Sequence, residues 1–436
     1  MTDQYQSTIR GRTASEIASS IEASIRGGHL APGNALPPIR SLAQELQVGH
    51  VTAANAYRRL AERGLLVTRR RAGTRVADQP PLAVRPRWVL PPGVRDLAFG
   101  NPDPKLLPPM PRLRPVSVGY GAASVEPELE EIIRADFRAD GIVTGSVTIV
   151  AGGMDGIERV LTARVRHGDR VGIEDPGFPR TIDLVAALGL VAEPIAVDER
   201  GLVPDALQAA VGRGLEALIV TPRAQNPSGA AMDEQRVTEL HAILANKPQI
   251  LILEDDHAGP VAGAPFHSLT LNRQHYAVVR SFSKALGPDL RLAALAGDDE
   301  TVARVAGRLR LGMGWVSHLL QRTVVTMLKA PRTKVYLARA ADAYAERRAK
   351  LLRALAAEGI NAWGRSGLNV WVPVLEETTT VQALLVAGYG AAAGERYRFH
   401  SAPAIRVSIS RLDPREAPKV ARAIALSQRD FGHARD

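Results

Sequence analysis

From about residue 147 onward, short apolar runs alternate with amphipathic stretches of helix length. The runs are VTIVAGG, RVGIEDPG, EALIVTP, ILILEDD, YAVVRSFSK and LRLAALAG. Continuous apolar runs of this length are typical of strands buried on both faces, so they predict a mostly parallel α/β sheet covered by helices. Ligands of such sheets bind beyond the carboxyl ends of the strands, where these runs become polar. LNVWVPV and IRVSISRL, in the last hundred residues, predict strands of a smaller α+β part.

The first 78 residues predict a separate α+β unit of three short helices followed by a β-hairpin. The first helix is expected to begin with Ser15 as its cap, the second after the Pro37-Pro38 pair and the third at about Val51. LLVTR and GTRVA predict the two strands, with the hairpin at RRAG. The side chains expected to form the core are Ile17, Ile21, Ile25, Ile39, Leu42, Ala43, Leu46, Ala53, Ala54, Tyr57 and Leu60.

The net charge of +10 is concentrated in this first unit. Residues 1–79 carry eleven arginines, no lysine and six acidic residues, a balance of +5. A small basic domain is the electrostatic footprint of a protein that binds the phosphate backbone of nucleic acid. Charge alone is equally consistent with an arginine-rich solvated surface.

The composition excludes several classes of chemistry. There is no cysteine, so disulfides, thiolate nucleophiles and cysteine-ligated metals are excluded, and no metal site is expected. No apolar run is long enough to span a bilayer and the N-terminus lacks a signal-peptide core, so a cytoplasmic protein is expected. Five prolines in residues 79–95, QPPLAVRPRWVLPPGVR, predict a stiff linker between domain 1–78 and domain 96–436. We place the large part of the second domain at about 120–315 and its small part at about 335–436.

The order of signals in the first domain resembles the GntR-type winged helix-turn-helix. The string GHLAPGNALPPIRSLAQELQVGHVTAANAYRRLAERGLLVTRRRAGTRV carries the resemblance over almost its whole length. The resemblance implies that the third helix enters the major groove of operator DNA and that the hairpin contacts phosphates or the minor groove. It departs from the family at Gly49-His50, where Ser-Arg is usual. The residues expected to contact DNA are Arg40, His50, Thr52, Asn55, Arg58, Arg71 and Gly73.

The string SFSKALGPDLRL, residues 281–292, resembles the cofactor loop of fold-type I pyridoxal-phosphate enzymes of the aminotransferase type. The resemblance implies that the Lys284 amine forms a Schiff base with the aldehyde of pyridoxal 5′-phosphate. Four further strings match the same family in order: AGGMDGIE, EDPGF, TPRAQNPSG and LILEDDHAG. The implied cofactor-binding residues are Gly153, Met154, Phe178, Asn226, Asp255, Ser281, Ser283, Lys284 and Arg291, and IRVSIS places Arg406 where the family binds a ligand carboxylate.

One residue of this set departs from the family. His257 stands two residues after Asp255, where the family usually has a tyrosine that bonds the cofactor O3′. The imidazole either replaces that bond or alters the electronics of the site, and the sequence leaves both alternatives open. Efficient transamination is therefore in doubt.

The fusion of the two domains resembles the MocR subgroup of GntR regulators, particularly members that govern vitamin B6 metabolism. This resemblance implies a homodimer that binds operator DNA and responds to pyridoxal phosphate, another B6 vitamer, or an amine or amino acid. An active aminotransferase with an incidental N-terminal extension is the alternative. A relic that binds DNA without any cofactor is a third.

Overall fold

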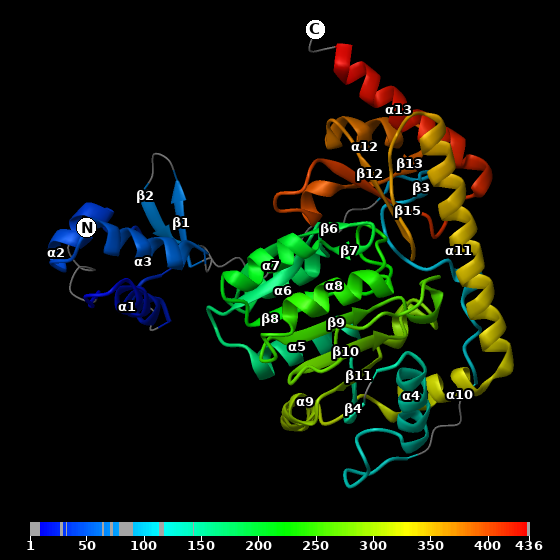
Figure 1. The fold of residues 1–436 in the computed structure, drawn as a ribbon, viewed down its shortest axis with the longest axis horizontal. Coiled ribbons are helices and arrows are strands. Elements are labelled where there is room, and N and C mark those ends of the chain that lie inside the picture. Colours follow the sequence, from blue (N-terminus) through cyan, green and yellow to red (C-terminus); the bar gives the residue numbers. More distant parts are fainter. Residues whose placement is uncertain are drawn as a thin grey trace. The chain divides into compact units, whose positions relative to one another are not determined.

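The computed structural model describes residues 9–26, 29–31, 33–62, 65–69, 73–77, 90–112, 117–142 and 144–433. These residues form two compact units, which are described in turn. The first contains helices α1 (Ala14–Arg26), α2 (Ile39–Glu45) and α3 (His50–Glu62) and the antiparallel hairpin β1 (Leu66–Arg69) and β2 (Gly73–Val76) (Figure 1). The three helices and the hairpin confirm the winged helix-turn-helix expected from the sequence.

The core of this unit follows the apolar stripes of its helices. Ile17, Ile21 and Leu60 are fully buried and pack in one cluster with the buried residues of α2. The expectation for α3 was wrong at one position, because Ala54 is only partly buried and Ala56 is fully buried instead.

The cap of α1 also differs from the expectation. Ser15 lies inside the helix, and Thr13 is the capping residue. The Thr13 hydroxyl accepts a hydrogen bond from the Glu16 amide at 3.2 Å, and the Glu16 carboxylate accepts the Thr13 amide at 3.4 Å and the Arg12 amide at 2.8 Å. This is a capping box, in which the Thr-x-x-Glu spacing satisfies amides that the first helical turn leaves unpaired.

An eight-stranded sheet forms the centre of the second unit, in the order β4-β11-β10-β9-β8-β5-β6-β7. The four strands β10, β9, β8 and β5 run parallel to their neighbours in that series, while β11 is antiparallel to β10 and β4. The mostly parallel sheet is therefore confirmed. Its strands are β4 (Ser146–Val150), β5 (Arg170–Asp175), β6 (Val191–Asp198), β7 (Gly201–Leu202), β8 (Ala217–Val220), β9 (Leu251–Asp256), β10 (Tyr276–Ser281) and β11 (Ala293–Gly297).

Helices cover both faces of this sheet. Helix α5 packs so closely on β10 that a Cβ added to Gly156 would lie 2.8 Å from Val279. Helices α7 and α8 bury Leu207 and Leu240 against Ile252, on the opposite face. The helices of the large part are α4 (Pro127–Ala139), α5 (Gly153–Arg164), α6 (Pro179–Ala187), α7 (Pro204–Gly212), α8 (Glu234–Leu244), α9 (Asp299–Leu311) and α10 (His318–Lys329).

The small part is built on the three-stranded sheet β12-β15-β14. The long helix α11 (Pro331–Ala357) runs along the edge of the unit toward it (Figure 1). Strand β3 (Arg95–Asp96) pairs with β13 (Tyr389–Gly390), so the chain following the proline-rich stretch is attached to the small part. Its remaining elements are β12 (Asn369–Pro373), β14 (Ala392–Ala393), β15 (Ala404–Ser408), α12 (Glu377–Val386) and α13 (Ala417–His433). None of the helices in the described ranges has the length and apolar character needed to cross a bilayer.

Candidate functional site

Lys284 stands in the turn that follows strand β10, at the carboxyl edge of the sheet. Its Nζ donates a hydrogen bond to the carbonyl oxygen of Gly100. Burial, together with the positive charges of Arg406 and Arg180, lowers the pKa of Lys284 to about 8. A lysine with a lowered pKa has a larger neutral fraction near neutral pH, which makes its amine a better nucleophile.

Asp255 lies near the end of β9, the strand beside β10, and is buried. Its Oδ1 has no hydrogen-bond partner among the described residues. Burial raises the pKa of Asp255 to about 7, and the charges of Asp256 and Glu174 contribute to the increase. A buried oxygen without a partner costs free energy, so this carboxyl group is suited to receive a donor or a positive charge from a ligand.

The N-terminus of helix α5 forms a cradle close to this carboxyl group. Gly152, with φ of 102°, precedes the helix, and a Cβ added there would lie 2.8 Å from the Arg291 guanidinium. A Cβ added to Gly153 would lie 3.7 Å from Asp255 Oδ1. Free amides at a helix N-terminus together with an arginine bind phosphate groups well.

The two serines of the Lys284 loop border the same cradle. The Ser281 Cβ lies 3.8 Å from the position of a Cβ on Gly153, and the Ser281 hydroxyl accepts the Ser283 amide at 3.2 Å. Met154 is the second residue of α5 and is half-buried. The structure thus brings Gly153, Ser281 and Arg291 of the implied cofactor-binding set together around the start of α5.

Arg406, on strand β15, is 5% exposed and already has protein partners. Its Nη1 donates to Asn226 Oδ1 at 2.9 Å, and its Nη2 donates to the carbonyl oxygen of Ala98. The guanidinium carbon lies 5.0 Å from the centre of the Tyr397 ring. A ligand carboxylate at Arg406 therefore has to compete with Asn226 and Ala98, which the sequence did not indicate.

His257 stands where the family usually has a tyrosine, but its imidazole makes a hydrogen bond within the chain. Its Nε2 lies 2.8 Å from the carbonyl oxygen of Ala224. Burial, with a further contribution from the charge of Lys284, lowers the pKa of His257 to about 4, so the ring is neutral. Because a carbonyl only accepts, Nε2 carries the hydrogen and Nδ1 is left as an acceptor.

Phe178 is the residue immediately before α6 and is half-buried. Its carbonyl oxygen accepts the amides of Thr181 at 3.0 Å and Ile182 at 3.2 Å. These contacts fix its backbone at the start of the helix.

Four residues that contact or influence Lys284, Asp255 or Arg406 were absent from the sequence-based set: Gly100, Glu174, Arg180 and Asn369. Glu174 stands inside the string EDPGF, yet nothing in the string showed that its charge reaches Asp255. Gly100 and Asn369 come from segments far away in the chain, and only the fold brings them to Arg406. No local signal could have identified them.

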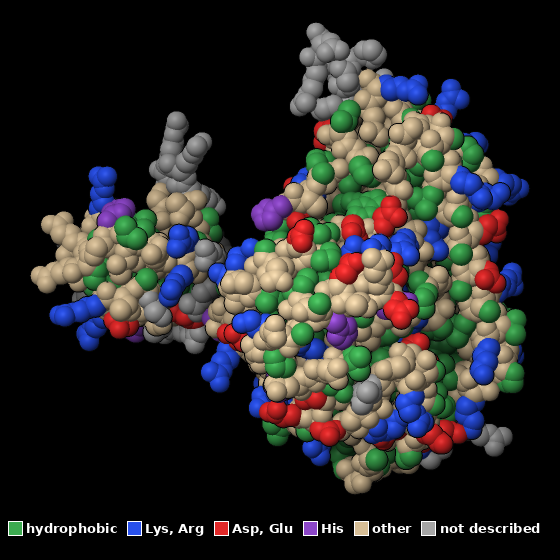
Figure 2. All heavy atoms as spheres, viewed as in Figure 1, with side chains coloured by type: hydrophobic (Ala, Val, Ile, Leu, Met, Phe, Trp, Pro, Cys, Tyr) green, Lys and Arg blue, Asp and Glu red, His purple; other side chains and the backbone are tan. Residues whose placement is uncertain are grey.

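The residues expected to bind DNA lie mostly on the surface of the first unit. Arg40, His50 and Arg58 are exposed, while Thr52 and Asn55 are half-buried on α3. Figure 2 shows arginine side chains, in blue, projecting from this unit with few acidic ones on the face in view.

The hairpin contributes one described residue to this set. Gly73 begins β2 with φ of 73° and has open space around it, which suits a close approach of backbone to DNA. Arg71 lies outside the described residues. Val51, which is 71% exposed beside His50 on α3, was not in the expected set.

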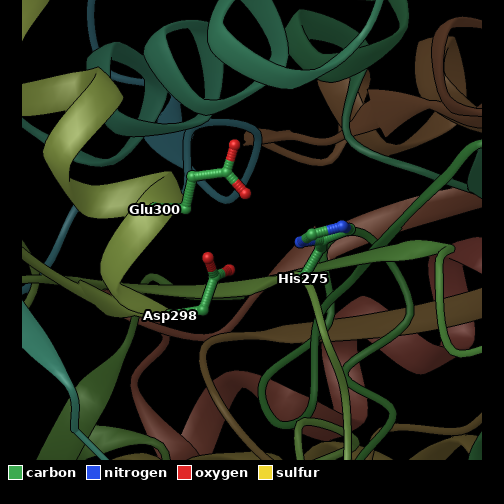
Figure 3. A group of neighbouring side chains, drawn as sticks. All are labelled: His275, Asp298 and Glu300. Carbon is green, nitrogen blue, oxygen red and sulfur yellow. The ribbon is translucent and has the colours of Figure 1, made fainter.

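His275, Asp298 and Glu300 form a cluster with metal-ligand chemistry, drawn in Figure 3. One ligand atom from each lies within 4.8 Å of the others. However, the Arg164 guanidinium lies 3.0 Å from Glu300 and 3.6 Å from Asp298, and it contacts His275 Nδ1. Asp298 also caps α9 by accepting the Thr301 amide at 2.9 Å. The arginine supplies the positive charge that a metal would supply, so we interpret the cluster as an ion-pair network.

A comparison with known protein families assigns a family to each of the two units. Residues 13–76 match the gntR family of bacterial regulatory proteins, and residues 118–424 match the class I and II aminotransferases. The chain is 39% identical over 420 residues to the vitamin B6 salvage pathway transcriptional repressor PtsJ of Salmonella typhimurium, covering 94% of this chain and 96% of that protein. It is 28% identical over 320 residues to the pyridoxine biosynthesis transcriptional regulator PdxR of Corynebacterium glutamicum, covering 68% of each.

Solved structures similar to this chain are aminotransferases. An archaeal alanine:glyoxylate aminotransferase aligns with a TM-score of 0.70 at 23% identity, covering 77% of this chain and 91% of that one. The Pyrococcus horikoshii kynurenine aminotransferase aligns with a TM-score of 0.69 at 17% identity, covering 78% and 91%. At these identities the similarity establishes the fold of the second unit.

Proposed function

The chain belongs to the MocR subgroup of GntR-type transcriptional regulators, in which a winged helix-turn-helix is joined to an aminotransferase-like domain, and we propose that it couples a ligand at Lys284 to operator binding. The ligand is pyridoxal 5′-phosphate or another B6 vitamer, or an amine or amino acid that reacts with the bound cofactor. The genes it controls belong to vitamin B6 metabolism, as the names of the relatives PtsJ and PdxR suggest. We further propose that it acts in the cytoplasm as a homodimer.

The observation that carries this proposal is that the amine of Lys284, in the turn after β10, and the unpartnered buried carboxyl group of Asp255, on β9, come from neighbouring strands at one edge of the sheet. Lys284 follows β10, and Asp255 lies on β9 with its Oδ1 lacking a partner in the described part of the chain. Pyridoxal phosphate, when bound, supplies an aldehyde that reacts with amines and a pyridinium ring that withdraws electrons. In this proposal Lys284 supplies the amine, and Asp255 pairs with the protonated ring nitrogen.

The rest of the site fits the same group. The α5 N-terminus and Arg291 would hold its phosphate, and Gly152 leaves the room that the cradle requires. Asn226 uses its Oδ1 to accept from Arg406, so its Nδ2 group is the donor available for a ring oxygen. His257 adds no such donor in its present orientation, because its N–H is bonded to Ala224.

A route from this site toward the operator-binding unit begins at the segment after β3. Arg406 and Lys284 donate to the carbonyl oxygens of Ala98 and Gly100, respectively. In sequence this segment directly follows the proline-rich stretch 79–95 that leads from the winged unit. A ligand that takes either cation from its carbonyl partner changes the contacts of the segment, which provides the differential interaction that coupling between two sites requires.

The decisive experiment is a spectral titration of the full chain with pyridoxal phosphate, followed by operator binding with and without it. We expect a yellow absorbance band that is missing in Lys284→Ala, and a change in operator affinity of about 5-fold or more on cofactor binding. A colourless protein that ignores added pyridoxal phosphate would refute the proposed ligand. Equal operator affinity in both states would refute the proposed coupling.

A second candidate function is supported by the same set of Lys284, Asp255 and Arg291, which an aminotransferase also needs. Steady transamination between amino acids and 2-oxo acids, with no sequence-specific DNA retention, would favour it. The orientation of His257 and the occupied guanidinium of Arg406 argue for slow turnover at most.

A further inference from the structure

The small-part sheet places an unpartnered acceptor beside Arg406. Asn369 begins β12 and is 4% exposed, and β12 pairs with β15 so that Asn369 lies opposite Ser408 and Trp371 lies opposite Arg406. Residues opposite each other and two apart along a strand share a face of the sheet. Asn369 and Arg406 therefore belong to the same face.

The Asn369 amide is poorly satisfied within the chain. Its Oδ1 is buried and accepts no hydrogen bond from any described residue, and its Nδ2 reaches Asn226 Oδ1 only at 3.5 Å. The neighbouring residues of β12, from Val370 to Val372, are apolar and buried. An apolar side chain would suit this buried strand position. Asn369 instead places there an oxygen that has lost its water and gained no hydrogen bond from the described residues, which suggests that a ligand supplies the donor.

The unpartnered oxygen lies next to the site around Lys284. A Cβ added to Gly100 would stand 3.8 Å from Asn369 Oδ1 and 3.9 Å from Arg406 Nη1, and the Gly100 carbonyl accepts from Lys284. Three side chains of different chemistry thus converge on Gly100: a nucleophilic amine, a guanidinium and a neutral acceptor. The Arg406 Nε is a second buried atom without a partner in the described structure.

These positions restrict the chemistry of a ligand. Arg406 attracts an anionic group, whereas Asn369 Oδ1 needs an N–H or O–H donor. The charges of Arg406 and Arg180 disfavour a further cation nearby, as they do for Lys284. The donor that fits is therefore uncharged, and in amino acids and B6 vitamers the uncharged donor is a hydroxyl group.

We propose that Asn369 is a specificity-determining residue of the ligand site and selects an anionic ligand that carries a hydroxyl group on the part that lies beside Arg406 and Gly100. This inference rests on the proposed function and deepens it. A hydroxyl-bearing amino acid carries its hydroxyl group close to the carboxylate that Arg406 attracts. Pyridoxine 5′-phosphate, with its phosphate held at Arg291 as proposed above, carries a hydroxyl group on the carbon that would lie toward Lys284. A plain amine or an unsubstituted carboxylate lacks such a group.

The test compares ligands that differ only in the hydroxyl group, by calorimetric titration of the full chain. One pair is L-serine and L-alanine, measured after loading with pyridoxal phosphate. The other pair is pyridoxine 5′-phosphate and 4-deoxypyridoxine 5′-phosphate, measured on the chain without cofactor. In at least one pair we expect the hydroxyl member to bind about tenfold more tightly, which corresponds to one hydrogen bond, and the responding pair identifies the source of the ligand.

Variants assign the preference to Asn369. Asn369→Leu should reduce it to less than twofold, whereas the same substitution at the exposed Asn361 should leave it unchanged. The unfolding temperature of Asn369→Leu should equal or exceed that of the wild-type chain, because the unpaired oxygen is removed. Asn369→Ala serves the same purpose if leucine prevents folding.

The outcomes separate this inference from the proposed function. Tight binding without a hydroxyl preference, or a preference that survives in Asn369→Leu, overturns the role of Asn369 while a Lys284-dependent absorbance band still supports the site. Absence of binding by all four ligands overturns the inference. If the absorbance band is absent as well, the proposed function fails with it.

Discussion

The Lys284 ammonium group donates a hydrogen bond to the carbonyl oxygen of Gly100, in the segment that follows strand β3. Lys284→Ala removes the donor, whereas Lys284→Arg keeps a cationic donor but lacks a nucleophilic amine. We expect faster amide hydrogen exchange in residues 97–101 for Lys284→Ala, by about tenfold, and near wild-type exchange for Lys284→Arg. Both variants should lose the absorbance band with pyridoxal phosphate.

The two variants should also differ in operator binding. Lys284→Ala should resemble the ligand-loaded chain, and Lys284→Arg should resemble the unloaded chain. Identical exchange and identical operator affinity in the two variants would show that the bond to Gly100 plays no part in coupling.

A second prediction concerns Asp255 and the pH dependence of stability. Its pKa in the folded chain is raised to about 7, above the value of 3.8 for an ordinary aspartate, so the folded state binds more protons between these pH values. Stability of the chain without cofactor therefore falls as the pH rises from about 4 through 7, and the full cost is present above pH 7. Asp255→Asn should remove this cost, raising the free energy of unfolding at pH 8 by on the order of 2–4 kcal/mol.

Denaturant unfolding at pH 4 and pH 8 measures this effect. The advantage of Asp255→Asn should largely vanish at pH 4, because the carboxyl group is neutral in the folded state and only partly ionised in the unfolded state. The exposed Asp342→Asn should show no such dependence. A destabilised Asp255→Asn at pH 8 would mean that Asp255 has a partner in the chain. The same variant should bind pyridoxal phosphate more weakly, because it cannot pair with a protonated ring nitrogen.

The sheet of the second unit could be predicted because its strands are continuous apolar runs buried on both faces. Six runs correspond to β4, β5, β8, β9, β10 and β11. The sequence did not reveal β6, whose residues alternate between buried and more accessible positions and include Pro194. A strand near the edge of a sheet lacks the uniform apolar signal of the central strands.

The residues of the candidate site likewise fall into those that the sequence could identify and those that it could not. Lys284, Asp255 and Arg291 lie in short strings with characteristic spacing, so their types and positions could be recognised locally. The partners of Arg406 could not, because Ala98 and Asn226 are 308 and 180 residues away from it in the chain. The orientation of His257 depended likewise on the Ala224 carbonyl, which only the folded chain places beside its ring.

The cap of α1 predicts that replacing two neighbouring hydroxyl residues, Thr13 and Ser15, has different effects on stability. Thr13 bonds the Glu16 amide, whereas Ser15 lies within the helix. Thr13→Ala should destabilise the helix by about 1 kcal/mol, because an N-cap is lost. Ser15→Ala should have little effect or stabilise slightly, since alanine favours the helix interior. Hydrogen exchange of the α1 amides in the full chain measures both, and equal effects would contradict the capping box.

The last prediction concerns how the winged unit holds DNA. Arg40 and Arg58 are exposed on α2 and α3, where arginines of a winged helix meet backbone phosphates or base edges. Replacing either with alanine should weaken operator binding, and each lost phosphate contact should reduce the slope of log affinity against log salt by roughly 0.9. Arg353→Ala removes the same charge from an exposed position on α11 and should leave both quantities unchanged. Fluorescence anisotropy with an operator duplex at several salt concentrations provides the measurement. A similar loss in all three variants would show that net charge alone drives binding, whereas unchanged slopes for Arg40→Ala and Arg58→Ala would place the phosphate contacts on other residues.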